Sequence, residues 1–309
     1  GKDLDGDGFM LCITGGEGTG KSNYVAALIA GAVKPENAEG IDTLGISIEG
    51  NPKGKAVLFY DTEQSEVQLY KNVSTLLRRC GRNTMPEWFK AYCLTGMSRK
   101  ERLKSIVLSM DRFHYQYGGI HLVVIDGIAD LIRCANDEAE SIAVVEELYR
   151  LAGIYNTCIV TVLHFIPNGL KLRGHLGSEL QRKAAAILSI EKDSNPAVSV
   201  VKALKVRDGS PLDVPLMQFA WDKGKAMHAY LGEKPKEEKD RRKEEELVAV
   251  ARELFSRKRF IGYMELSEEL QAAFDVKERT AKSYIRFMRE KEIIVKSPDT
   301  PNSYMLGEV

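Results

Sequence analysis

The sequence carries no net charge, no long apolar run and no closely spaced cysteine pair, and each absence narrows the class of protein. Its 44 Lys and Arg residues balance 44 Asp and Glu residues, so composition alone indicates no nucleic-acid partner. No apolar run reaches the roughly 18 residues of a membrane-spanning helix, and residues 1–8 lack the apolar stretch of a signal peptide, so we expect no membrane partner. The five cysteines are scattered without a C-x-x-C pair, which suits a cytoplasmic location and argues against a zinc site.

A glycine-rich segment at residues 15–22 is the most informative feature that the sequence does contain. Its spacing is G-x-x-x-x-G-K-S/T, that of a phosphate-binding P-loop, and it lies between an apolar run of strand length and a segment with helical spacing. Backbone N–H groups of such a loop close around phosphates, and the helix N-terminus adds its positive dipole end. The predicted nucleotide-binding residues are Gly15, Gly16, Glu17, Gly18, Thr19, Gly20, Lys21, Ser22 and Asn23.

The motif also predicts ATP and Mg²⁺ as cofactors. We expect Lys21 to reach the β- and γ-phosphates and the Ser22 hydroxyl to coordinate Mg²⁺. The alternative, a glycine-rich turn that merely precedes a helix, does not explain why strand, loop and helix occur in the order that a P-loop requires.

Short apolar runs alternate with helical patterns from residue 9 to about residue 190. This alternation predicts an α/β fold, with a mostly parallel sheet covered by helices on both faces. Runs at 198–205 and 216–221 alternate apolar and polar residues more strictly and indicate antiparallel edge strands. The earlier runs are 9–14, 56–60, 122–125, 158–163 and 186–190.

The chain is predicted to contain two domains joined by a charged segment. We expect an ATPase domain at 1–232, a linker with mixed charge at 233–243, and a second domain at 244–309. Three helical patterns followed by a predicted hairpin make the second domain resemble a winged-helix domain.

The third helical pattern of this second domain is rich in positive charge. Residues 277–291 contain six basic and two acidic residues, a local excess of four on a neutral protein, which is typical of a DNA-recognition helix. A winged helix that contacts protein instead is the alternative. The predicted duplex-DNA contacts are Arg279, Lys282, Arg286 and Arg289.

Two carboxylates at predicted strand ends complete the expected site. Asp126 closes a run of four apolar residues, which is the Walker B pattern, and we expect it in the Mg²⁺ shell on a strand beside the P-loop strand. Gly127 follows where many ATPases carry a second acid, so the water-activating carboxylate must come from elsewhere. Glu63, after the run 56–60, is the candidate; its alternative role is to stabilise a helix dipole.

Together these elements resemble the RecA superfamily of ATPases, and especially its RepA-like and DnaB-like hexameric helicases. The resemblance covers residues 9 to about 222 and implies a RecA-like core, Glu63 as catalytic base and a homo-oligomer such as a hexamer. It implies that His164 senses the γ-phosphate, although Phe165 replaces the family's second sensor histidine. It also implies that Lys205 and Arg207 reach the γ-phosphate of the neighbouring subunit.

A loop before residue 178 resembles the Arg-Gly-Ser loop of RepA-like proteins. We expect Lys171 and Arg173 on this loop to follow the backbone of single-stranded DNA, with nucleotide sensing as the alternative role. The tract 174–180 is similar to ATPase proteins of bacterial mobilizable transposons and plasmids.

The sequence therefore predicts a DNA-associated ATPase: a helicase-like motor or accessory ATPase in replication, mobilization or transposition of a mobile element. Single-stranded DNA would bind the ATPase ring and duplex DNA the winged helix. The alternative is a site-specific DNA-binding regulator whose assembly ATP controls. A small-molecule kinase is disfavoured because no acceptor-binding lid is evident.

Overall fold

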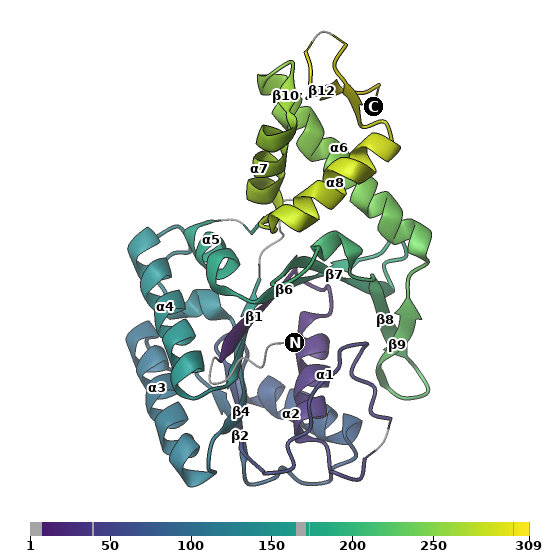
Figure 1. Ribbon diagram of the computed structural model, residues 1–309. Helices are drawn as coiled ribbons and strands as arrows, with labels where there is room; N and C mark the ends of the chain where they lie inside the picture. Colours follow the sequence, from purple (N-terminus) through teal and green to yellow (C-terminus); the bar gives the residue numbers. More distant parts are fainter. Residues whose placement is uncertain (1–7, 39, 165–170, 173, 299, 309) are drawn as a thin grey trace. The chain divides into compact units, whose positions relative to one another are not determined.

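The computed structural model describes residues 8–38, 40–164, 171–172, 174–298 and 300–308. The chain forms two compact units (Figure 1). The first unit contains residues 1–201 and 217–232, and the second contains residues 202–216 and 233–309. The second unit is therefore built from two stretches of chain that are separate in sequence.

Within the described residues, nine strands form one sheet, in the order β3-β2-β4-β5-β1-β6-β7-β8-β9. Pairing is parallel between β3 and β2, β2 and β4, β4 and β5, β5 and β1, and β1 and β6, whereas β7 and β8 are antiparallel. The strands are β1 (Phe9–Thr14), β2 (Ala56–Asp61), β3 (Phe89–Cys93), β4 (Ile120–Asp126), β5 (Cys158–Leu163), β6 (Ala186–Lys192), β7 (Val198–Val206), β8 (Met217–Asp222) and β9 (Met227–Glu233).

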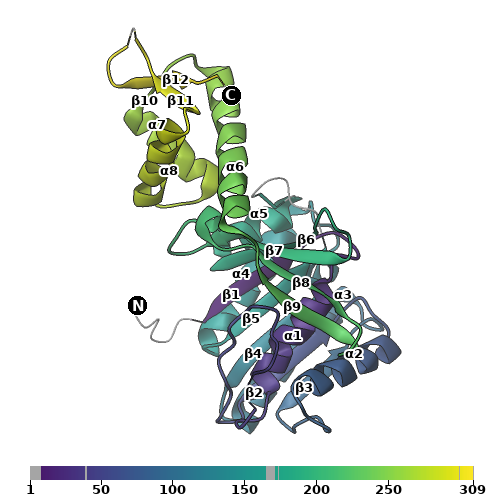
Figure 2. The same cartoon turned by 90° about the vertical axis from the view of Figure 1, so that its right-hand side faces the viewer.

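Helices cover both faces of this sheet, as Figures 1 and 2 show from two sides. One face carries α1 (Lys21–Val33) and α2 (Glu66–Arg79). The opposite face carries α3 (Arg99–Gln116), α4 (Glu138–Ile154) and α5 (Gly174–Lys183). The described residues also form two short 3₁₀ helices, η1 (Ile128–Leu131) in the first unit and η2 (Pro211–Asp213) in the second.

Alternation of side chains along β2 explains why both faces are covered. Val57 and Phe59 pack into the apolar cluster formed with α1 and α2. Their neighbours Leu58 and Tyr60 are also buried, and Tyr60 makes a 2.5 Å hydrogen bond with Ser109 of α3. Successive side chains of a strand point to opposite faces, so a strand with six buried residues in succession needs helices on both sides.

The second unit contains a helix, a short strand, two further helices and a hairpin. Its sheet has the order β10-β12-β11, and both pairings are antiparallel. Leu247, Leu266 and Ile285 from the three helices are buried in its core. The elements are α6 (Lys236–Arg257), β10 (Ile261–Gly262), α7 (Tyr263–Phe274), α8 (Glu278–Glu290), β11 (Ile294–Lys296) and β12 (Ser303–Leu306).

The structure confirms the predicted α/β class: a large, mostly parallel sheet flanked by helices, consistent with a RecA-like P-loop NTPase core. Strands β3 and β9 were not predicted. The charged stretch 233–243 is mostly the first part of α6, since its Glu, Lys and Arg residues favour helix and Pro235 precedes the first turn. None of the described helices is both long and apolar enough to cross a membrane.

One feature of the strand order corrects the sequence analysis. Asp126 was expected on a strand beside the P-loop strand, but β5 lies between β1 and β4. Strand neighbours cannot be read from local patterns, because every buried parallel strand has a similar apolar run. Strand β5 ends at Leu163 and His164 follows it. His164 therefore follows the strand that lies between the P-loop strand β1 and the Asp126 strand β4.

Candidate nucleotide-binding site

The loop between β1 and α1 has a conformation that requires glycine at two positions. Gly15 and Gly20 have φ angles of 151° and 98°, in the region that L side chains rarely adopt. A Cβ on Gly15 would lie 2.3 Å from the Ile190 carbonyl oxygen, and a Cβ on Gly20 would lie 2.9 Å from the Phe219 ring. The loop is closed further by the Thr19 hydroxyl, which donates to the Gly16 carbonyl at 2.9 Å.

Lys21 lies inside this loop. Its Nζ donates to the Gly15 carbonyl at 2.9 Å and also to the Gly16 carbonyl. Burial lowers the pKa of Lys21, while the carboxylates of Asp126 and Glu63 act in the opposite direction. Backbone carbonyls therefore orient the Lys21 ammonium. Phosphate oxygens are stronger acceptors than these carbonyls, because their hydrogen bonds with the ammonium are charge-assisted.

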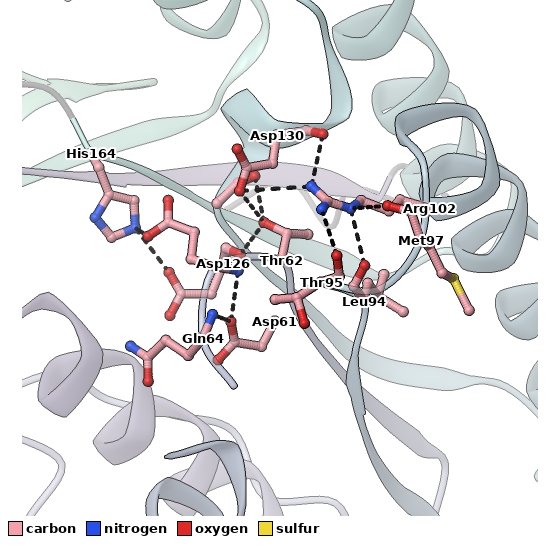
Figure 3. A network of polar contacts seen from close by, with 12 residues as sticks. Asp61, Thr62, Gln64, Leu94, Thr95, Met97, Arg102, Asp126, Asp130 and His164 are labelled. Carbon is pink, nitrogen blue, oxygen red and sulfur yellow. Dashed lines mark hydrogen bonds and ion pairs between the residues drawn. The ribbon is translucent and has the colours of Figure 1, made fainter. Parts of the chain in front are cut away.

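Three side chains from neighbouring strand ends meet beside the loop (Figure 3). His164 Nε2 lies 3.2 Å from Glu63 Oε2 and 3.2 Å from Asp126 Oδ1. Glu63 follows β2, Asp126 ends β4 and His164 follows β5. The structure therefore brings together three residues that the sequence analysis selected separately.

Burial raises the pKa of Glu63 above that of an ordinary glutamate. His164 opposes the shift, and the carboxylates of Asp126, Asp130 and Asp61 add to it. A carboxylate with a raised pKa beside a positively charged loop is a better proton acceptor than an exposed one, which suits a general base.

Two residues that the sequence analysis did not select fix the backbone of Glu63. Asp61 Oδ1 accepts hydrogen bonds from the backbone N–H groups of Glu63 at 3.0 Å and Gln64 at 2.8 Å. The Thr62 hydroxyl lies 2.9 Å from the carbonyl oxygens of Asp126 and Gly127. Both residues stand immediately before Glu63, after an apolar run. That position in the sequence was the one feature that could have identified them as supporting residues.

Gly127 accounts for the missing second acid after Asp126. Its φ is 96°, and a Cβ there would lie 2.2 Å from Thr62 Oγ1 and 2.8 Å from Glu63 Cγ. Any side chain at this position would displace Thr62 and Glu63. A second acid therefore does not fit after Asp126, and the candidate base is Glu63, which follows β2.

The donor set fits a magnesium ion bound together with nucleotide. Ser22 supplies a hydroxyl oxygen and Asp126 a carboxylate oxygen, and Mg²⁺ prefers one or two such ligands beside phosphate and water. In the part of the chain that the structure describes, no group of three or more His, Cys, Asp or Glu residues could hold a metal. A metal site made by protein alone is therefore not found among those residues.

The remaining residues selected from the sequence lie elsewhere. Lys205 and Arg207 belong to the second unit, where Lys205 Nζ lies 2.7 Å from Asp275 Oδ2 and Arg207 is exposed. Lys171 is exposed, whereas Arg173 and Phe165 lie outside the described residues.

The four basic residues selected on α8 are all exposed. Lys282 pairs with Glu278 at 2.7 Å, and Arg286 pairs with Glu290 at 2.8 Å. Arg279 and Arg289 make no ion pair with another described residue. Pairs between exposed side chains one helical turn apart contribute little to stability.

Comparison with known proteins gives the family. A family model described as an AAA domain matches residues 2–168, which span β1 to β5 and contain the P-loop, Glu63, Asp126 and His164. No curated protein matches the chain. With more than half of its residues covered by that model, the chain belongs to this AAA-domain family of P-loop ATPases.

Proposed function

We propose that this protein is a DNA-associated ATPase in which Glu63 activates the attacking water. The observation that carries the proposal is the meeting of Glu63, His164 and Asp126 at 3.2 Å contacts beside a P-loop. When bound, Mg²⁺ neutralises charge on the β- and γ-phosphates. Lys21 binds the same phosphates from the loop.

Each residue of the cluster has a separate role in this proposal. Glu63 Oε2 accepts the proton of the water that attacks the γ-phosphate. His164 Nε2 lies 3.2 Å from an oxygen of each carboxylate. His164 therefore orients Glu63 and responds to the phosphate that enters beside Asp126. Ser22 and Asp126 would hold the magnesium ion.

DNA association is proposed from the second unit. Its order of helix, strand, two helices and hairpin resembles that of a winged helix, in which α8 would enter the major groove. The exposed cations Arg279, Lys282, Arg286 and Arg289 on this helix support binding to phosphates. A helicase-like motor in replication, mobilization or transposition of a mobile element, assembled as a homo-oligomer, is the finer form of the proposal.

An alternative function is favoured by one contact. Lys205, proposed to act on a neighbouring subunit, is engaged by Asp275 at 2.7 Å within its own chain. A cation held in this way suits a site-specific regulator in which ATP binding controls assembly without motor activity.

One experiment tests the proposal and separates the two functions. ATP hydrolysis is measured for the protein and for Glu63→Gln, without DNA and with single-stranded or duplex DNA. We expect Glu63→Gln to bind ATP and to hydrolyse it on the order of 10²-fold more slowly. Stimulation by single strands supports the motor, and duplex binding without stimulation supports the regulator. Normal turnover by Glu63→Gln would refute the proposed base.

A further inference from the structure

A partly buried polar network connects the backbone of Glu63 to the loops after the two strands that flank β2. Figure 3 shows Arg102 at the centre of hydrogen bonds to Leu94, Thr95, Met97 and Asp130. Leu94, Thr95 and Met97 follow β3, and Asp130 lies on η1, which follows β4. Neither Arg102 nor Asp130 has a role in nucleotide binding or water activation as described above.

The guanidinium of Arg102 donates hydrogen bonds to backbone carbonyls in the loop after β3 and in η1 after β4. Nε donates to the Leu94 carbonyl at 3.0 Å and to the Met97 carbonyl at 3.1 Å, and Nη2 donates to the Thr95 carbonyl at 3.2 Å. Nη1 donates to the Asp130 carbonyl at 3.2 Å and lies 3.8 Å from its carboxylate. The side chain of Arg102 is only 14% exposed, and its bonds to the Leu94 and Asp130 carbonyls are partly buried. Only a planar fork of several N–H donors can satisfy carbonyls in both loops at once.

Asp130 connects Arg102 to Thr62. Its Oδ2 lies 3.1 Å from the Thr62 hydroxyl, which also approaches the carbonyls of Asp126 and Gly127 at 2.9 Å. The Thr62 backbone N–H donates to the Asp126 carbonyl at 3.1 Å. Thr62 is 2% exposed and directly precedes Glu63, so its backbone cannot move without moving that of Glu63.

We propose that Arg102 and Asp130, acting through Thr62, are positioning residues that hold the Glu63 carboxylate in register with Asp126 and His164. The inference rests on the proposed role of Glu63 as base. The three residues touch neither nucleotide nor water; they fix the strand end from which the base projects. The network explains why the loops after β3 and β4 are joined by a half-buried arginine rather than by apolar packing alone.

The test compares variants of this network with matched changes elsewhere in the first unit. Thr62→Val removes the hydroxyl at nearly constant volume, and Thr62→Ser retains it. Thr157→Val is the control, because Thr157 is 4% exposed and its hydroxyl has no partner among the described residues. Arg102→Lys is matched by Arg79→Lys, since Arg79 is buried and its hydrogen bonds to other described residues go to backbone carbonyls, those of Asp42 and His228.

We expect Thr62→Val and Arg102→Lys to lower kcat for ATP hydrolysis by about 10- to 100-fold, the usual effect of removing a supporting contact. ATP affinity, measured by titration with a fluorescent nucleotide, should remain within about twofold, because the P-loop is untouched. Thr62→Ser should restore most of kcat. The Arg79→Lys control should lower thermal stability to a similar degree without slowing turnover of the folded protein. Thr157→Val should not slow turnover either, and it should leave thermal stability unchanged or raise it, because it removes an unpaired buried hydroxyl.

Two results would overturn the inference. One is normal kcat in Thr62→Val and Arg102→Lys; the other is an equal loss of kcat in the Arg79→Lys control, which would show a purely structural role. Glu63→Gln, assayed in parallel, separates this failure from failure of the proposed function. If Glu63→Gln is slow while the network variants are fast, only the positioning inference is wrong.

Discussion

Replacing Gly127 by alanine adds one methyl group just beyond the paired ends of β2 and β4. The new Cβ would lie 2.2 Å from Thr62 Oγ1 and 2.8 Å from Glu63 Cγ. Real Cβ contacts shorter than 3.0 Å are essentially never found, so the Thr62 side chain must retreat by at least 0.8 Å. Thr62 supports the backbone of Glu63, and a mutation that misplaces the groups around a reaction by about 1 Å can cost on the order of 10²-fold in rate, so we expect a loss of that order in kcat.

The same substitution also strains the backbone, and a second glycine separates the two effects. Gly127 has a φ of 96° and Gly118 a φ of 66°, and an alanine in the left-handed region costs roughly 1–2 kcal/mol. A Cβ on Gly118 meets nothing within 4 Å. Both variants should therefore unfold a few degrees earlier, at about 2–8 °C below the parent protein, but only Gly127→Ala should lose turnover.

The assay is phosphate release at saturating ATP, well below the unfolding temperature of either variant. Binding of a fluorescent nucleotide checks that the P-loop is intact. Equal turnover in Gly127→Ala and Gly118→Ala would refute the argument, because it would show that displacing Thr62 and Glu63 has no effect on the reaction.

The remaining predictions concern the nucleotide, the pH, the DNA and the neighbouring subunit. Lys21→Ala should lose most nucleotide affinity or turnover while its circular dichroism spectrum stays unchanged, since loop geometry depends on glycines. Because burial raises the pKa of Glu63, kcat should fall with decreasing pH at values above the 4.5 of an ordinary glutamate, and a profile flat to that value would contradict the assignment. Reversing Arg286 and Arg289 to Glu should weaken duplex binding and flatten its salt dependence by about 0.9 in the log–log slope for each phosphate that is no longer neutralised; an unchanged slope would show that α8 faces another partner. Arg207→Ala should bind ATP yet lose turnover, and mixing it with Lys21→Ala under subunit exchange should restore part of the activity, whereas an inactive mixture would exclude action across subunits.

Local chemistry made the nucleotide loop predictable. The glycines, Lys21 and Ser22 are adjacent in sequence, and their spacing alone determines how a backbone can surround phosphate. Glu63 and Asp126 were selected for a related reason: Asp126 ends an apolar run and Glu63 closely follows one, and the carboxyl ends of parallel strands meet at one edge of a sheet.

The supporting residues were not predictable because their partners are distant in sequence. Arg102 lies in the first turn of α3, where a basic residue has no distinctive pattern, and its contact with Asp130 spans 28 positions. Strand β3 was missed because its aromatic residues, Phe89 and Tyr92, have helical spacing in a short segment. The pairing of Lys205 with Asp275 depends on how the second unit folds, which no local pattern encodes.

The division of the second unit into two stretches of chain also has a consequence for how it is made. Residues 202–216 are synthesised first, but their partners come much later: Ser210 hydrogen-bonds Tyr284, 74 positions further along, and the Ala203 carbonyl accepts from Arg242. At a synthesis rate of about 5–20 residues per second, the Ser210 hydroxyl waits roughly 4–15 s for Tyr284 to be added. The segment 202–216 therefore leaves the ribosome before the surface that buries it exists, and the second unit can close only after most of the chain has been translated.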